Sequence, residues 1–262
     1  FGVRLRRETG DAATDAGRGR EASMIAIVAA LPGELSAIEA AASAEGPLTT
    51  RRVAGRDLRG GTLCGRPVLL ALSGVGKVAA ASTATLLVEQ ASAVILVGTA
   101  GGIGTGVEPG DVVVAAELVQ HDLDARPLWD RWVVPSLGLS HIPADKALTA
   151  ALAAAAEVVI GEHGADLAAL GLGTPHWHLG TIASGDTFIA TAEDSTRLRR
   201  DLPGTLAVEM EGAAIAQVCH TAGVPFAVAR TISDRADQAA SVDFPKFLER
   251  IAAPYARDLV VT

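Results

Sequence analysis

Two carboxylates stand inside an otherwise apolar run of the chain. The stretch LAVEMEGAAIA, residues 206–216, holds Glu209 and Glu211 on either side of Met210. An ionised side chain is costly in apolar surroundings unless fixed partners replace its water. The spacing of two residues puts both carboxylates on the same side of an extended chain. Some feature of the folded protein must therefore compensate for these two charges.

Further polar residues directly follow other short apolar runs. These residues are Glu34, Ser73, Arg230, Ser233 and Asp234. For each of them alone, a helix cap or a solvated turn is the ordinary explanation. In parallel α/β sheets, however, ligands bind beyond the carboxyl ends of the strands. Carboxylates, an arginine and serines at several strand ends therefore indicate one shared site.

The elements that must position these residues alternate along the chain from Met24 onward. Short apolar runs predict strands at residues 24–30, 67–72, 93–98, 111–120, 177–184, 205–209 and 225–233. Ala-rich patterns between them predict helices at 33–43, 76–90, 144–157, 193–200, 211–222 and 243–261. Such alternation predicts an α/β fold with a mainly parallel sheet covered by helices on both faces.

The stretch 124–143 has no clear periodicity and is predicted to be the longest loop. Its Trp129 and Trp132 could cap a pocket or pack against a partner chain. Ordinary packing within the chain is the alternative that the sequence favours.

Composition places the chain among globular proteins with one large core. It has 262 residues, of which 49% are hydrophobic, and one domain over residues 24–262 is expected. Residues 1–23 are rich in charge, Gly and Ala and are predicted to be a disordered extension. The net charge of -8 argues against nucleic acid or an anionic membrane surface as the main partner.

The two cysteines, Cys64 and Cys219, stand in apolar settings without metal-ligand spacing. Buried free thiols in a reducing compartment are the simplest account. No uninterrupted apolar run approaches the length of a membrane span, so we expect a cytoplasmic protein.

One motif resembles a dinucleotide fingerprint but lacks its partner. Residues 67–80, PVLLALSGVGKVAA, form a predicted strand followed by Gly74, Gly76 and a predicted helix. The fingerprint also needs an acidic residue at the end of the next strand, where this chain reads ILVGTAGG. His176 and His178 lie at strand spacing without a matching acid or cysteine nearby. We therefore expect neither a nicotinamide or flavin cofactor nor a metal ion.

Several motifs together resemble one known family. AALPGE, SGVGK, GTAGG, SGDTFIA, VEMEGAAIA and RTISDRADQ occur in this order between Met24 and about residue 260. They are similar to the purine nucleosidase and phosphorylase family, most closely to its 5'-methylthioadenosine/S-adenosylhomocysteine nucleosidase branch. The resemblance implies a three-layer α/β/α sandwich around a mixed sheet, and a homodimer. It also implies cleavage of the N-glycosidic bond between adenine and a 5'-thio-substituted ribose, with water and without a cofactor.

The same resemblance assigns the two catalytic groups. Asp234 matches the acid that donates a proton to purine N7 and accepts a hydrogen bond from the exocyclic amine, provided that its surroundings keep it protonated at neutral pH. An aspartate there suits a 6-aminopurine. Glu34 matches the residue that activates the attacking water. An ionised glutamate would repel phosphate, so hydrolysis is favoured over phosphorolysis.

Binding roles follow by the same resemblance. Glu211 accepts hydrogen bonds from the ribose hydroxyls and stabilises the positive charge of the oxocarbenium-like transition state. Glu209 orients its neighbours, with a purely structural ion pair as an equal alternative. Met210 packs against the sugar, or is an ordinary core methionine.

The remaining matches surround the base and the water. The backbone of Phe188 and Ile189 matches the segment that reads the adenine edge, and the Phe188 ring could stack on the base or lie in the interior. Arg230 and Ser73 are expected around the attacking water. Ser233 is expected to fix the loop that carries Asp234.

The chain also departs from the family pattern. Pro32-Gly33 precedes Glu34 in place of an acidic run, Ala190 replaces a polar residue, and the 124–143 loop differs from the commonest version. That loop is expected to help enclose the 5' substituent, which the sequence does not identify. A phosphorylase, an aminodeoxyfutalosine nucleosidase and a non-catalytic nucleoside-binding protein remain alternatives.

Overall fold

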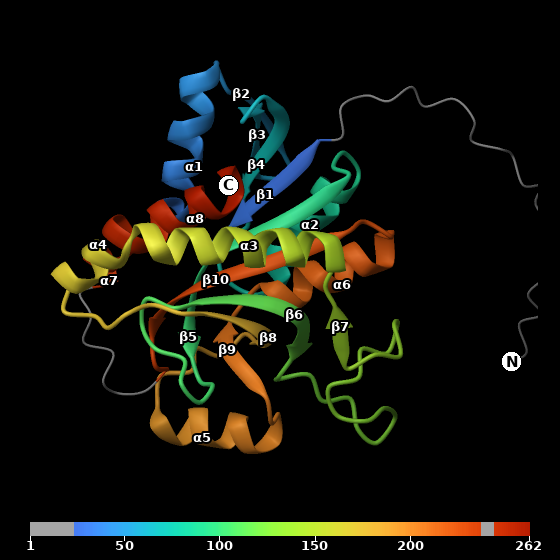
Figure 1. The fold of residues 1–262 in the computed structure, drawn as a ribbon. Coiled ribbons are helices and arrows are strands. Elements are labelled where there is room, and N and C mark those ends of the chain that lie inside the picture. The colour runs from blue at the N-terminus through green and yellow to red at the C-terminus, as the bar shows by residue number, and fades with distance from the viewer. Residues whose placement is uncertain (1–23, 237–243) are drawn as a thin grey trace, which may run out of the picture.

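The computed structural model describes residues 24–236 and 244–262, so the predicted disorder of residues 1–23 lies outside the described residues (Figure 1). Every predicted strand is present close to its predicted position. These strands are β1 (Ile25–Ala29), β4 (Arg66–Leu72), β5 (Ala93–Gly102), β6 (Val112–Gln120), β8 (Trp177–Ser184), β9 (Thr205–Glu209) and β10 (Phe226–Asp234). Within the described residues they join further strands in one 10-stranded sheet.

The sheet mixes parallel and antiparallel pairs, as predicted. Strand β1 pairs in parallel with β4 and β5, and β5 pairs in parallel with β10. Strand β8 pairs in parallel with β6 and β9. Antiparallel pairs of β10 with β6 and of β5 with β9 join these two groups. As a result, the carboxyl ends of β1, β5, β9 and β10 meet around one site.

A polar hairpin was missed by the sequence analysis. Strands β2 (Thr49–Val53) and β3 (Arg56–Leu63) continue antiparallel into β4. Their turns, Ala54-Gly55 and Cys64-Gly65, have positive φ at both residues, as two-residue hairpin turns of type I′ require. The exposed strand β2 has no apolar alternation that would reveal it. Cys64 lies exposed in the second turn, so its predicted burial was wrong, whereas Cys219 is buried as predicted.

Helices cover both faces of the sheet and confirm the predicted three-layer sandwich (Figure 1). The helices on one face are α1 (Pro32–Glu45), α3 (Lys146–Glu162) and α8 (Ala253–Val261), and those on the other are α2 (Lys77–Val88) and α6 (Gly212–Ala222). Strand β1 illustrates how one strand packs against helices on both faces of the sheet. Ile27 and Ala29 pack with α1, while Ala26 and Val28 pack with α2 and α6, because successive side chains of a strand point to opposite faces.

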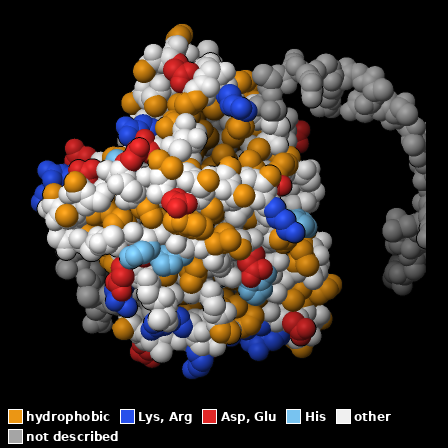
Figure 2. Space-filling view, viewed as in Figure 1, with side chains coloured by type: hydrophobic (Ala, Val, Ile, Leu, Met, Phe, Trp, Pro, Cys, Tyr) orange, Lys and Arg blue, Asp and Glu red, His pale blue; other side chains and the backbone are white. Residues whose placement is uncertain are grey.

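The remaining elements are short. They are β7 (His141–Pro143), α4 (Gly164–Ala169), α5 (Ala192–Asp201), α7 (Phe244–Phe247) and the π-helical turn η1 (Leu248–Ala252), which leads into α8. On the face that carries α3, apolar side chains lie interspersed with charged ones (Figure 2). No helix in the described part of the chain combines the length and apolar character needed to cross a membrane.

Candidate active site

One cavity of about 330 Å³ opens at the carboxyl ends of β1, β5, β9 and β10. Most of the predicted site residues line it. They are Glu34, Phe188, Ile189, Glu209, Met210, Glu211, Ser233 and Asp234. Glu34 and Asp234, which lie far apart in sequence, therefore face the same nucleoside-sized space.

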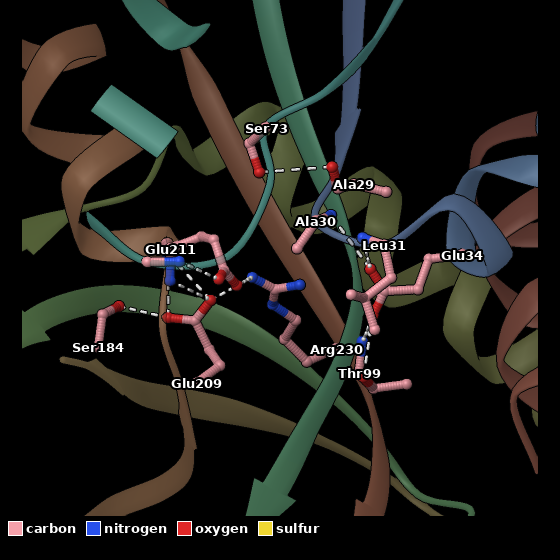
Figure 3. A network of polar contacts seen from close by, with 12 residues as sticks. Ala29, Ala30, Leu31, Glu34, Ser73, Thr99, Ser184, Glu209, Glu211 and Arg230 are labelled. Carbon is pink, nitrogen blue, oxygen red and sulfur yellow. Dashed lines mark hydrogen bonds and ion pairs between the residues drawn. The ribbon is translucent and has the colours of Figure 1, made fainter. Parts of the chain in front are cut away.

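Glu34 is held in the first turn of α1 and is only 1% exposed. Its Oε2 accepts hydrogen bonds from the backbone N–H groups of Ala30 (3.1 Å) and Leu31 (2.9 Å). Its Oε1 accepts from the Thr99 N–H (2.8 Å) and the Thr99 hydroxyl (2.9 Å) (Figure 3). The carboxylate is thus fixed by four donors, and only the Thr99 hydroxyl can rotate away to let a ligand in.

Glu209 lies at the end of β9, directly before α6, and its partners explain why a carboxylate is tolerated there. It accepts hydrogen bonds from the N–H groups of Glu211 (3.1 Å) and Gly212 (2.9 Å) and from the Ser184 hydroxyl. The same hydroxyl accepts from the Ala213 N–H (2.7 Å). The carboxylate therefore satisfies N–H groups at the start of α6 that have no partner within the helix, where negative charge is favourable.

Arg230, on β10, is the buried cation of this region and is 0% exposed. Its Nη2 donates to Glu209 and to Glu211 Oε2 (3.1 Å) (Figure 3). Its Nη1 donates to the Val97 carbonyl (3.3 Å). Gly98 allows this close approach, since a Cβ there would lie 2.5 Å from Arg230 Nη1 and 2.8 Å from Glu34 Oε1. Arg230 is therefore a counter-ion behind the cavity wall and does not line the cavity.

Glu209 and Glu211 both pair with this guanidinium, and the charge of Glu34 also acts on it. Burial, and then the charge of Glu209, raise the pKa of Glu211 to about 7, against the opposing effects of Arg230 and of the Gly76 N–H. That N–H donates to Glu211 Oε1 at 3.0 Å. Glu211 thus takes up a proton near neutral pH, and it lines the cavity with fewer protein partners than Glu209.

Asp234 is placed by an irregularity at the end of β10. The register with β5 shifts between Ile232 and Asp234, which brings Asp234 opposite Gly101. Such a shift re-aims a side chain relative to regular pleating. Asp234 Oδ2 accepts from the Ser233 hydroxyl (2.7 Å) and Oδ1 from the Ala236 N–H (2.7 Å). Ser233 therefore contacts Asp234 directly, and its role in fixing this loop stays a prediction.

The outer edge of the cavity is apolar and open. Phe188 is 72% exposed and Val75 is 55% exposed, although both line the cavity. Phe188 is therefore not an interior aromatic residue. Ile189, next to it, is buried.

Ser73 is not brought into the cavity. It is fully buried, and its hydroxyl donates to the Gly74 carbonyl at 2.8 Å. Thr99, which the sequence analysis passed over, supplies the hydroxyl beside Glu34 instead. The available signal was its place in GTAGG, directly after the predicted strand 93–98.

The 124–143 loop contributes no lining residue from this chain. The Trp132 indole N–H donates to the His121 carbonyl (3.2 Å), and Arg131 stacks over its ring. Trp129 is partly exposed. The expected enclosure of the 5' substituent is therefore not provided by this loop within one chain.

The histidine pair has an acid that the sequence analysis missed. Asp111 accepts the His176 N–H (2.8 Å) and lies 2.8 Å from His178 Nε2. Within the described ranges, no group of three or more His, Cys, Asp or Glu residues could hold a metal ion.

Comparison with known proteins identifies the class. The sequence model of the phosphorylase superfamily matches residues 24–262, so the chain belongs to this superfamily. A 5'-methylthioadenosine/S-adenosylhomocysteine nucleosidase from Shewanella sp. (strain W3-18-1) is 36% identical over 240 residues, which cover 90% of this chain and 96% of that relative.

Solved structures agree with this placement. The nucleosidase of the same description from Neisseria meningitidis, in complex with methylthio-immucillin-A, has 31% identity and a TM-score of 0.79, covering 91% of this chain and 99% of that one. Futalosine hydrolase of Helicobacter pylori strain 26695 has 30% identity and a TM-score of 0.76, covering 92% and 97%.

Proposed function

We propose that the protein hydrolyses the N-glycosidic bond of adenine nucleosides with a 5'-thio substituent, namely 5'-methylthioadenosine and S-adenosylhomocysteine. The products are adenine and the thioribose. The observation that carries the proposal is that Glu34 and Asp234 line one cavity of about 330 Å³. The names of the similar nucleosidases support the same reaction.

The reaction needs an acid at the base and a nucleophile at the sugar. Asp234, held by Ser233 and the Ala236 N–H, is proposed to donate a proton to adenine N7 and to accept from the exocyclic amine. Glu34 is proposed to take the proton of the attacking water after the Thr99 hydroxyl turns away. Glu211 accepts from the ribose hydroxyls, and its negative charge stabilises the oxocarbenium-like transition state.

Charge in the cavity supports hydrolysis over phosphorolysis. Glu34, Glu209, Glu211 and Asp234 line it, and none of its described lining residues is Lys or Arg. The buried guanidinium of Arg230 already donates to Glu209, Glu211 and Val97. Inorganic phosphate would meet carboxylates without a free cation, which costs Coulomb energy in a site of low dielectric.

The same charges bear on the second candidate, hydrolysis of a futalosine-type nucleoside. Similarity to the futalosine hydrolase of Helicobacter pylori favours it. The 5' extension of aminodeoxyfutalosine carries a carboxylate, however, and the apolar and acidic residues that line the cavity in the described part of the chain include no cation to pair with it. We therefore propose the neutral methylthio group as the preferred 5' substituent.

We further propose a cytoplasmic homodimer. Val75 and Val78 are exposed apolar residues, and Val75 lines the cavity, so a partner chain seated there would cover its edge. The exposed free thiol of Cys64 is suited to a reducing compartment. Sedimentation of the purified protein tests the dimer.

An adenine-release assay tests the reaction. We expect release from 5'-methylthioadenosine at the same rate with and without phosphate. A panel that adds S-adenosylhomocysteine, adenosine and aminodeoxyfutalosine ranks the 5' substituents. A strict requirement for phosphate, or release only from aminodeoxyfutalosine, would contradict the proposal.

A further inference from the structure

The SGVGK motif has a structural role that differs from nucleotide binding. Gly76 has a φ of 94°, which favours glycine, and a Cβ there would lie 3.1 Å from Asp186 Oδ1. The two amides at the start of α2 already have acceptors. The Gly76 N–H donates to Glu211 Oε1 (3.0 Å), and the Lys77 N–H donates to Asp186 Oδ1 (2.8 Å). Two of the protein's own carboxylates thus occupy the position where a phosphate would bind.

A closed ring of contacts links this motif to the opposite loop. Lys77 Nζ lies 2.6 Å from Asp122 Oδ1 and donates to Gln120 Oε1 at 3.1 Å. Asp122 Oδ2 accepts the Asp186 N–H at 2.9 Å. Because Asp186 in turn accepts the Lys77 N–H, the ring closes through the three residues. We call Lys77, Asp122 and Asp186 the loop clamp.

The loop clamp joins three separate parts of the chain. Lys77 begins α2, Asp122 follows β6, and Asp186 follows β8. The Lys77 side chain is 16% exposed and that of Asp122 is 26% exposed. Burial acts to raise the pKa of Asp122, but the hydrogen bonds from Lys77 and the Asp186 N–H outweigh it and lower this pKa. Asp122 therefore stays charged at neutral pH.

The residues next to the loop clamp line the cavity, whereas the clamp residues do not. These lining residues are Val75, which precedes Gly76 and Lys77, and Thr187, Phe188 and Ile189, which follow Asp186; Gly76 itself does not line the cavity. We propose that Lys77, Asp122 and Asp186 are positioning residues that hold these two loops in register, so that the Gly76 amide reaches Glu211 while Phe188 and Ile189 face the purine. The catalytic consequence rests on the proposed function, whereas the coupling of the loops does not.

Hydrogen exchange tests the coupling without any substrate. We expect Asp122→Asn to speed exchange of backbone amides by at least ~10-fold in both loops, residues 74–77 and 185–189, although Asp122 bonds to the backbone of only one of them. Arg59→Met is the matched control. It breaks the 2.5 Å ion pair with Glu39, which lies outside the cavity, and we expect exchange in both loops to stay unchanged. Faster exchange confined to residues 185–189 would overturn the clamp.

Kinetics test the catalytic consequence. For 5'-methylthioadenosine, we expect Lys77→Met and Asp122→Asn each to lower kcat/KM by about 10-fold, chiefly through KM, and the double variant to be no worse than the worse single variant. Affinity for adenine alone should fall less than affinity for the nucleoside, because of the two clamped loops adenine contacts only residues 187–189, whereas the ribose also depends on Glu211 and the Gly76 amide. A merely structural role would lower the melting temperature and leave both affinities unchanged, and that result would overturn the positioning role. If the wild-type protein releases no adenine, the proposed function fails while hydrogen exchange still decides the clamp.

Discussion

The two ends of the cavity are built on opposite plans. The deep end consists of the lining residues Glu34, Thr99, Glu209 and Glu211 with Arg230 behind them, and these residues are mostly buried and joined by hydrogen bonds (Figure 3). The open rim consists of Val75, Phe188 and Phe244, which are exposed and apolar. Charges that act on a transition state must be oriented before the substrate arrives. Apolar surface is effective only when the ligand covers it, so it can remain open until then.

This contrast predicts that changes at the deep end affect both folding and catalysis, and the largest effect is expected at Arg230. Arg230→Met leaves Glu34, Glu209 and Glu211 without a cation in a buried site. We expect a loss of about 3–5 kcal/mol in the free energy of unfolding, or failure to fold, because removing one partner strands buried charge. Urea denaturation measures this loss. Arg52→Met, which removes an exposed pair with Asp57, should change stability by less than ~0.5 kcal/mol.

A smaller loss of stability, together with a large loss of turnover, is expected when the two proposed catalytic carboxyls are neutralised. Glu34→Gln and Asp234→Asn keep size and shape, and each should lower turnover of 5'-methylthioadenosine by ~100-fold or more. Adenine release measures the rate, and near-ultraviolet circular dichroism checks that the fold is intact. Full activity in both variants would show that the assigned roles are wrong.

The buried charge of Glu211 is expected to destabilise the folded protein at neutral and higher pH. Its pKa rises from 4.5 to about 7 on folding, so between these values the folded protein keeps a proton that the unfolded chain has lost. Stability from this group therefore falls as pH rises from 4.5 to about 7 and is constant above that. Glu211→Gln removes this dependence and should raise the free energy of unfolding at pH 8 by about 1–3 kcal/mol.

The gain should come with lost activity. We expect Glu211→Gln to lower kcat/KM by ~10-fold or more, since the transition-state charge loses its carboxylate. Urea denaturation at pH 5 and pH 8 measures the stability of the wild type and the variant, and adenine release measures the activity. The carboxylates whose pKa values are lowered, Asp122, Asp124, Asp194, Asp201 and Asp258, titrate below the usual aspartate value of 3.8 and therefore outside this pH range. Burial lowers the pKa of His121 below its usual value of 6.5, but wild type and variant share that group, so the difference between the two proteins reports on Glu211. A variant that is less stable than the wild type at both pH values would contradict the assignment.

The sequence predicted which strand ends form the site more reliably than which side chains face the cavity. Glu34, Arg230 and Asp234 were predictable because polar residues after apolar runs mark strand ends, and parallel strands bring those ends together. Ser73 satisfied the same rule, yet its hydroxyl turns to the Gly74 carbonyl while Thr99 faces Glu34. Pleating and local register shifts decide which strand-end side chain enters the cavity, and the sequence does not display them.

Two other features depended on contacts that have no local pattern. Strand β2 is exposed and polar, so no apolar alternation marks it. The carboxylates of Glu209 and Asp186 accept backbone N–H groups at the starts of α6 and α2, and only tertiary structure brings Asp186 to its partner Lys77. Carboxylates in apolar stretches of the sequence indicate that each must have a hydrogen-bond or ionic partner, but the sequence does not identify that partner.

The open rim should respond in the opposite way to the deep end, with the smallest effect of the series at Phe188. Because Phe188 is 72% exposed, Phe188→Ala should change the free energy of unfolding by less than ~0.5 kcal/mol. Loss of stacking on the base should raise KM for 5'-methylthioadenosine by about 2- to 10-fold with little change in kcat. Leu179→Ala, at an exposed residue of β8 outside the cavity, is the control and should leave both quantities unchanged. If Phe188→Ala instead costs more than ~1 kcal/mol of stability, the ring is packed before substrate binds, and the rim is organised in advance like the deep end.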